Sequence, residues 1–273
     1  MIMEKYRIIL VITLNLSRYI DAKIKIAADM NFCVLEVFKI TFSRFEKHYY
    51  KVRRHSMKTN LTIKLLQEES YKFSIKESKC FESTIYGVTD GKAIGTYLEH
   101  KFQKYLKKKY IYDQGNSAKG IDFPELKVDM KVTSIKQPQS SCPFKTARQK
   151  IFGLGYSLLV FVYEKIDNDE IKKGKLNILH TIFVEKDRTA DFQITSQIHK
   201  ILDTEGNKDD LIALMISINL PVDDIEMNNI ADDIIAERPK IGYLTISNAL
   251  QWRLQYNRII DKAGAIEGII RVK

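Results

Sequence analysis

Residues 119–133 constrain this chain more than any other stretch, because they can place two carboxylates and one ammonium group around a single point. The segment reads as a short strand, a turn and a second strand over 126–133. Side chains alternate between the two faces of a strand, so Asp129 and Lys131 project together. Asp122 lies at the mouth of the same strand. Two neighbouring carboxylates resist ionising together, and a divalent cation between them reverses that penalty.

This arrangement favours hydrolysis of a phosphodiester. A site rich in oxygen ligands but with few protein ligands suits Mg²⁺, which polarises a phosphoryl oxygen and lowers the pKa of a bound water. Lys131 would hold or orient the nucleophile and balance the charge that develops on phosphorus. The plainer interpretation of an Asp-x-Lys pair is a solvated face of an edge strand.

The surrounding pattern predicts an α/β fold. A helical stripe precedes the strand, and Glu99 flanks it; the stripe comprises Ile94, Tyr97, Leu98, Phe102, Tyr105 and Leu106. After the strand, a polar loop over 137–141 leads to a helix whose first turn suits Pro143 and which residues 147–156 can continue. The apolar run 158–163 then fits a strand that is buried on both faces. The expected order is therefore helix, strand, strand with Asp-x-Lys, helix, strand.

Ile121-Asp122 followed by Asp129-Met130-Lys131 resembles the metal-binding signature of the PD-(D/E)xK nuclease superfamily, in the setting of its type II restriction endonucleases. The chain departs from the pattern in having Ile121 where proline is usual, and in the short gap between the carboxylates. The resemblance covers about residues 90–165. It implies a restriction-endonuclease-like core, in which a central mixed sheet is flanked by helices.

The same resemblance implies roles for individual residues. Asp122 and Asp129 would bind Mg²⁺, Glu99 on the first helix would assist, and Lys131 would complete the catalytic set. Polar residues of the later helix would face DNA, namely Arg148, Gln149 and Lys150. Lys119 is a further candidate for phosphate contact, with simple solvent exposure as the alternative.

Composition agrees with a nucleic-acid partner. Lys and Arg total 44 against 34 Asp and Glu, a formal net charge of +10, which favours binding to a polyanion. The three cysteines form neither a zinc pattern nor a disulfide framework, so we expect a cytoplasmic protein. The apolar run over 8–16 is too short to span a membrane as a helix. We expect residues 1–56 to be an extension, 57–220 the nuclease core and 221–273 a C-terminal module.

The expected C-terminal module is helical and resembles a winged helix-turn-helix. A helix predicted from Thr245 to about Asp261 would be its second helix, which in such folds enters the major groove. The polar face of this helix would present Asn248, Gln251, Gln255 and Arg258 to DNA. A dimerisation helix anchored by Trp252 is the competing interpretation.

Together these features predict a type II restriction endonuclease, which would cut double-stranded DNA at a specific short sequence with Mg²⁺. A homodimer would break both strands, although two successive nicks by a monomer would suffice. The family also implies a cognate DNA methyltransferase as functional partner. The alternatives are a structure-directed repair or recombination nuclease and a non-catalytic DNA-binding regulator. Neither implies a membrane partner.

Overall fold

A mixed sheet with helices around it forms the frame of the molecule. The structure, a computed structural model, describes residues 58–115, 120–247 and 253–273. In chain order their elements are β1 (Thr59–Asn60), α3 (Ile63–Glu77), β2 (Phe81–Glu82), η1 (Ser83–Ile85), α4 (Gly91–Lys107), β3 (Tyr110–Ile111), β4 (Val128–Ser134), β5 (Gln139–Ser141), α5 (Ala147–Phe152), β6 (Ser157–Asn168), β7 (Lys173–Val184), η2 (Lys186–Arg188), α6 (Phe192–Asp203), α7 (Lys208–Ser217), α8 (Asp224–Ala236), β8 (Thr245–Ser247), β9 (Arg253–Gln255), α9 (Asn257–Lys262) and β10 (Ile269–Arg271).

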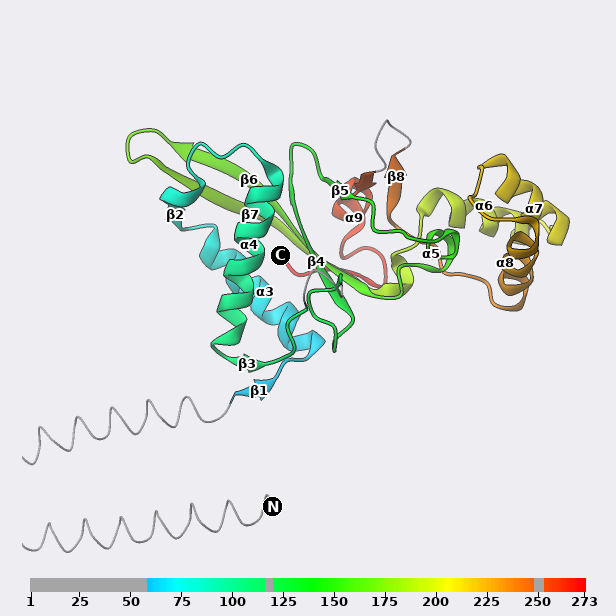
Figure 1. Ribbon diagram of the computed structural model, residues 1–273, viewed down its shortest axis with the longest axis horizontal. Helices are drawn as coiled ribbons and strands as arrows, with labels where there is room; N and C mark the ends of the chain where they lie inside the picture. The colour runs from blue at the N-terminus through cyan, green and yellow to red at the C-terminus, as the bar shows by residue number, and fades with distance from the viewer. Residues whose placement is uncertain (1–57, 116–119, 248–252) are drawn as a thin grey trace, which may run out of the picture. The chain divides into compact units, whose positions relative to one another are not determined.

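The order of the main sheet is β10-β7-β6-β4, and β2 also pairs with β7. Strands β6 and β7 form a long antiparallel hairpin, whereas β4 runs parallel to β6. A parallel pair needs a crossover connection, and here the segment that contains β5 and α5 supplies it (Figure 1). The predicted α/β core with a central mixed sheet flanked by helices is confirmed. Strand β4 lies at the edge of this sheet.

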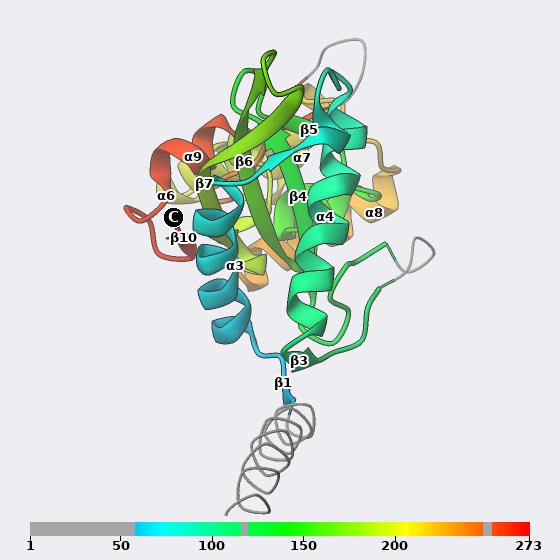
Figure 2. The same cartoon turned by 90° about the vertical axis from the view of Figure 1, so that its left-hand side faces the viewer.

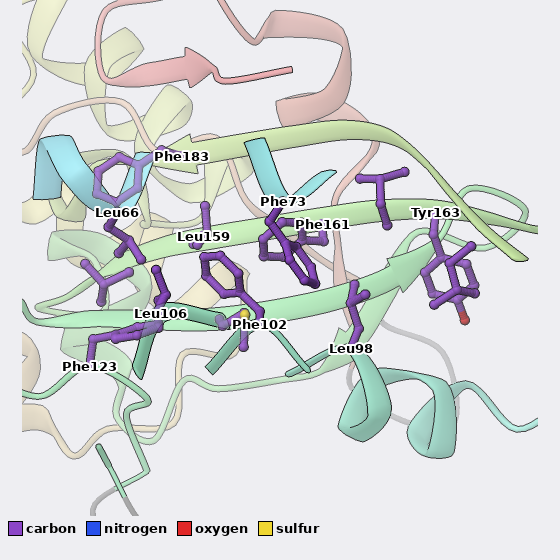
Figure 3. Close-up of a cluster of buried hydrophobic side chains, with 14 of the residues drawn as sticks. Leu66, Phe73, Leu98, Phe102, Leu106, Phe123, Leu159, Phe161, Tyr163 and Phe183 are labelled. Carbon is purple, nitrogen blue, oxygen red and sulfur yellow. The ribbon is translucent and has the colours of Figure 1, made fainter. Parts of the chain in front are cut away.

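Helices α3 and α4 cover one face of the sheet (Figure 2). The stripe of α4 enters this interface, where Leu98, Phe102 and Leu106 are fully buried. Phe102 lies with its ring centroid 4.9 Å from that of Phe73 on α3 and 5.3 Å from that of Phe161 on β6 (Figure 3). Aromatic pairs at these separations add about 0.5–1.5 kcal/mol each beyond the burial of their area. The same core includes Val128 and Met130, so α4 also packs against β4.

The opposite side of the sheet packs against α9, β8 and β9, through buried residues such as Leu158 and Val160. Helices α5, α6, α7 and α8 enclose a separate apolar cluster, which includes Ile151, Ile198 and Ile230. Strands β5, β9 and β8 form a second, three-stranded sheet.

The predicted helix from Thr245 to Asp261 is wrong. Described residues of this stretch form β8 and β9, followed by the short helix α9. Ile246 and Leu254 are eight positions apart, a spacing that fits one face of a helix, but in the structure they pair across an antiparallel hairpin. Leu254 is fully buried and both of its neighbours are only partly buried, which is the period of a strand. The winged-helix interpretation fails for this reason.

Residues Thr59–Lys273 form one compact unit. The proposed boundary at Leu220-Pro221 falls between α7 and α8, which pack against each other, and the final strand β10 returns to the main sheet beside β7. Residues 1–56 lie outside the described part of the chain.

Candidate active site

A tight turn delivers Asp122 to the open edge of β4. Phe123 and Val128 exchange two backbone hydrogen bonds, and Lys127 between them adopts a left-handed φ of 51°. Asp122 itself lies in the loop that precedes this turn. Its Oδ2 accepts a hydrogen bond of 2.9 Å from the backbone N–H of Met130. The turn therefore supplies a carboxylate that accepts a hydrogen bond from a backbone N–H on the unpaired edge of β4.

Asp129 and Lys131 lie two residues apart on β4 and form an ion pair, with 2.7 Å between Nζ and Oδ2. The alternation expected for a strand puts them on the same side, while Met130 between them enters the core. Asp129 is only 4% exposed, so its charge is largely removed from water. A buried carboxylate with a single ammonium partner retains capacity for a further cation.

The carboxylates of the site interact strongly. Burial, together with hydrogen bonding and repulsion from Asp129, raises the pKa of Asp122 to about 7. Burial also raises the pKa of Glu99 on α4, where the charge of Lys131 opposes the shift and that of Asp129 adds to it. The structure thus places Asp122 beside Asp129 and Lys131, and places Glu99 near enough to interact with the charges of Asp129 and Lys131.

Gln103 is a neighbour of this site that sequence reasoning missed. It is 6% exposed and its Nε2 donates to Oδ1 of Asp122 over 3.3 Å. Its own Oε1 accepts from Gln114, and its backbone carbonyl accepts from the hydroxyl of Tyr112 over 3.0 Å. Gln103 follows Glu99 by four residues on α4, the spacing of one helix face. That spacing is the sequence signal that could have placed Gln103 near the site.

Tyr156 is a second neighbour, which approaches Asp129 from the segment before β6. Burial and the charge of Asp129 raise the pKa of Tyr156 to about 12, so the phenol stays protonated and can donate a hydrogen bond. The apolar pattern around Tyr156 predicts only a helix continuing from residue 147, whereas α5 ends at Phe152 before Gly153 with a φ of 90°.

Comparison with known proteins shows the family of this chain. The family described as "Type II restriction enzyme NspV" matches residues 60–271. A curated protein of that name from Nostoc sp. (strain ATCC 29411 / PCC 7524) is 64% identical over 214 residues, which cover 78% of this chain and 97% of the relative. This chain belongs to the NspV family of type II restriction enzymes. It is therefore a hydrolase of the restriction endonuclease class, a site-specific deoxyribonuclease that acts on DNA. No solved structure matches the chain.

The site fits the divalent metal that type II restriction enzymes generally use. Across residues 58–115, 120–247 and 253–273, no three acidic, histidine or cysteine side chains converge as a ready-made set of ligands. A hard cation that keeps several waters and takes substrate phosphate oxygens needs only one or two carboxylates. Asp122 and Asp129 supply that number, and their mutual repulsion makes a cation between them favourable.

Other residues predicted to touch DNA have partners within the enzyme. Arg148 forms ion pairs with Glu226 and Asp233 of α8, at 2.5 and 2.6 Å. Gln149 forms the capping box of α5 with Thr146. Arg148 thus links α5 to α8, and Gln149 stabilises the start of α5.

Lys150 is buried, and burial lowers the pKa of its ammonium group. The guanidinium carbon of Arg258 lies 3.6 Å from the ring centroid of Phe192, and the Nε of Arg258 is buried without a hydrogen-bond partner. Gln255 lies on β9. The remaining candidates, Lys119, Asn248 and Gln251, lie outside the described residues, so the structure does not place them. None of the described helices is both long and apolar enough to cross a bilayer.

Proposed function

We propose that this enzyme hydrolyses phosphodiester bonds of duplex DNA with Mg²⁺ held by Asp122 and Asp129. The observation that supports this most strongly is the Asp122 carboxylate, which the Met130 N–H fixes beside the buried Asp129 on an edge strand. A Mg²⁺ ion bound there would supply positive charge to the scissile phosphate and lower the pKa of the attacking water.

Lys131 and Glu99 would act on the water and the phosphate. The ion pair with Asp129 holds the ammonium of Lys131 in place, from where it can donate a hydrogen bond to the attacking water and balance the charge on phosphorus. Glu99 approaches the same charges from α4, and burial raises its pKa. A carboxylate with a raised pKa takes up a proton more readily, so Glu99 would assist directly or through a water molecule.

Cleavage of unmethylated plasmid or phage DNA tests this proposal. The wild-type enzyme should give discrete fragments with Mg²⁺ and none in EDTA. Asp129→Asn and Lys131→Ala should abolish cutting but still bind DNA in Ca²⁺. Asp232→Asn is a matched control, because Asp232 makes only an exposed ion pair with Lys208 on the helical part, and it should cut normally. Retained cleavage by Asp129→Asn would refute the assignment.

We further propose that the enzyme acts as a homodimer and is paired with a cognate DNA methyltransferase. Cutting a duplex requires two phosphodiester breaks, and two copies of a single site would supply them together. Sedimentation of the enzyme on its own recognition duplex should give two chains per duplex. A nicked plasmid that accumulates before the linear product, with one chain per duplex, would instead indicate successive nicks by a monomer. Methylation of the recognition site should block cutting.

A further inference from the structure

The sheet of β5, β9 and β8 has one buried and one outward face. Leu254 is fully buried, and the hydroxyl of Ser140, its partner in register, hydrogen bonds to the hydroxyl of the buried Tyr256 over 2.6 Å. Alternation therefore turns the residues on either side of Ser140 and Leu254 to the other face. These residues are Gln139 and Ser141 on β5, and Arg253 and Gln255 on β9. All four are polar, and none is acidic.

This polar face adjoins the strand that carries the candidate active site. Thr133 follows Asp129 and Lys131 on the same side of β4. The Oγ1 of Thr133 accepts from the backbone N–H of Gln139 over 2.9 Å and donates to its carbonyl over 3.1 Å. Four residues of strand separate Thr133 from Asp129, about 13 Å. That length equals about four base-pair steps at about 3.4 Å each, so bases contacted near Gln139 would fall within a short recognition site that includes the cut.

Gln139 and Gln255 face each other in register and form one hydrogen bond, 3.0 Å from Nε2 of Gln255 to Oε1 of Gln139. This bond leaves the amide N–H groups of Gln139 as donors at one end of the pair and the Oε1 of Gln255 as an acceptor at the other. In the major groove, adenine presents the N7 acceptor beside the N6 donor, and amide side chains are the groups that pair with both. A β-ribbon also fits that groove.

We propose that the Gln139–Gln255 pair reads an A·T base pair of the recognition sequence from the major groove. None of the four outward side chains is acidic, and Arg253 is basic, so this face suits a polyanion. The adjoining β4 positions the pair relative to the cut. This inference rests on the site-specific cleavage that the family establishes; of its steps, only the distance from the pair to the cut depends on which residues hold the metal.

The test compares cleavage rates at the recognition site, first mapped from fragment ends, with rates at sites that carry one substituted base pair. Gln139→Ala and Gln255→Ala should each reduce discrimination at the same A·T position by roughly 10- to 100-fold. Gln139→Glu is the sharper variant, because it keeps an acceptor for Gln255 Nε2 and replaces the donor by a carboxylate oxygen. The added negative charge weakens binding to every DNA sequence alike, so the ratio of rates between sites is the quantity that decides. Gln139→Glu should lose the same discrimination while its thermal unfolding temperature stays that of the wild type.

Gln197→Ala is the matched control, since Gln197 is an exposed glutamine on α6, and it should discriminate as the wild type does. Wild-type discrimination ratios in Gln139→Glu and Gln255→Ala would overturn the proposal. So would a uniform loss of cleavage with unchanged ratios, which would assign the pair to folding or catalysis. If instead the metal assignment is wrong, Asp129→Asn will cut, whatever the discrimination ratios show.

Discussion

Replacing Asp122 by asparagine should stabilise the metal-free enzyme at alkaline pH while it abolishes cutting. The folded state raises the pKa of Asp122 from 3.8 to about 7, because the group is buried and adjoins Asp129. A carboxyl group with a raised folded-state pKa destabilises the protein as pH rises through that range. Each tenfold change in proton affinity is worth about 1.4 kcal/mol. At pH 8 the raised pKa therefore destabilises the folded state by about 4 kcal/mol.

The net gain should be smaller than this penalty. Asparagine keeps one oxygen to accept from the Met130 N–H, but its amide nitrogen cannot accept from Gln103 as Oδ1 of Asp122 does. Loss of that bond costs about 1 kcal/mol, and solvent at this partly exposed side chain weakens the repulsion. We therefore expect Asp122→Asn to gain about 1–3 kcal/mol at pH 8 and less at pH 5.

Urea denaturation in EDTA at pH 5 and pH 8 measures this gain. Mg²⁺ should then stabilise the wild type, since a ligand of the folded state adds stability by mass action, and should not stabilise Asp122→Asn. The exposed Asp232→Asn variant is the control and should not show the gain of Asp122→Asn at pH 8. The reasoning would be refuted if Asp122→Asn were less stable than the wild type at pH 8, or if its gain were the same at both values.

Three further outcomes are expected. Burial opposes ionisation of Glu69, but hydrogen bonds, the first of them from Lys109, lower its pKa to about 2. Glu69→Gln should therefore lower the free energy of unfolding by about 1–2 kcal/mol at pH 7, after allowance for the exposed ammonium groups. This difference from the wild type should disappear as the pH falls from 4.5 to 2. A constant difference in acid unfolding curves would contradict this. Gln103→Leu should weaken Mg²⁺ binding, measured by calorimetry, several-fold through loss of its bond to Asp122; unchanged binding would remove Gln103 from the site. A chain that begins at Met57 should fold and cut normally, because the family match spans residues 60–271; loss of activity would show that the preceding residues are needed.

Much of the fold follows from local patterns in the sequence. The stripe of α4 has the period of a helix, and the apolar run of β6 has the short length and the valine and aromatic content of a buried strand. The pattern of β4 likewise predicts that Asp129 and Lys131 share one side. The helix expected from Thr245 failed because its spacing of eight residues also fits a hairpin, and only the pairing with β5 decides between the two.

The same distinction between local and distant contacts applies to the site residues. Asp122, Asp129 and Lys131 are close in sequence, so a turn and a strand suffice to bring them together. In the sequence, Arg148 resembles a DNA contact. In the structure it pairs with acidic residues of α8, one of which, Asp233, follows it by 85 residues. No local pattern reveals a pairing of that range. The contact between Gln139 and Gln255, 116 residues apart, is hidden for the same reason.

Mn²⁺ binding followed by electron paramagnetic resonance, with cleavage measured on the same samples, tests the central claim most directly. Wild-type enzyme on its recognition duplex should bind Mn²⁺ and cut at discrete positions. Asp122→Asn and Asp129→Asn should lose both the bound ion and the cutting, whereas Asp232→Asn should keep both. Bound Mn²⁺ and normal cutting in either active-site variant would contradict the account and place the metal elsewhere in the enzyme.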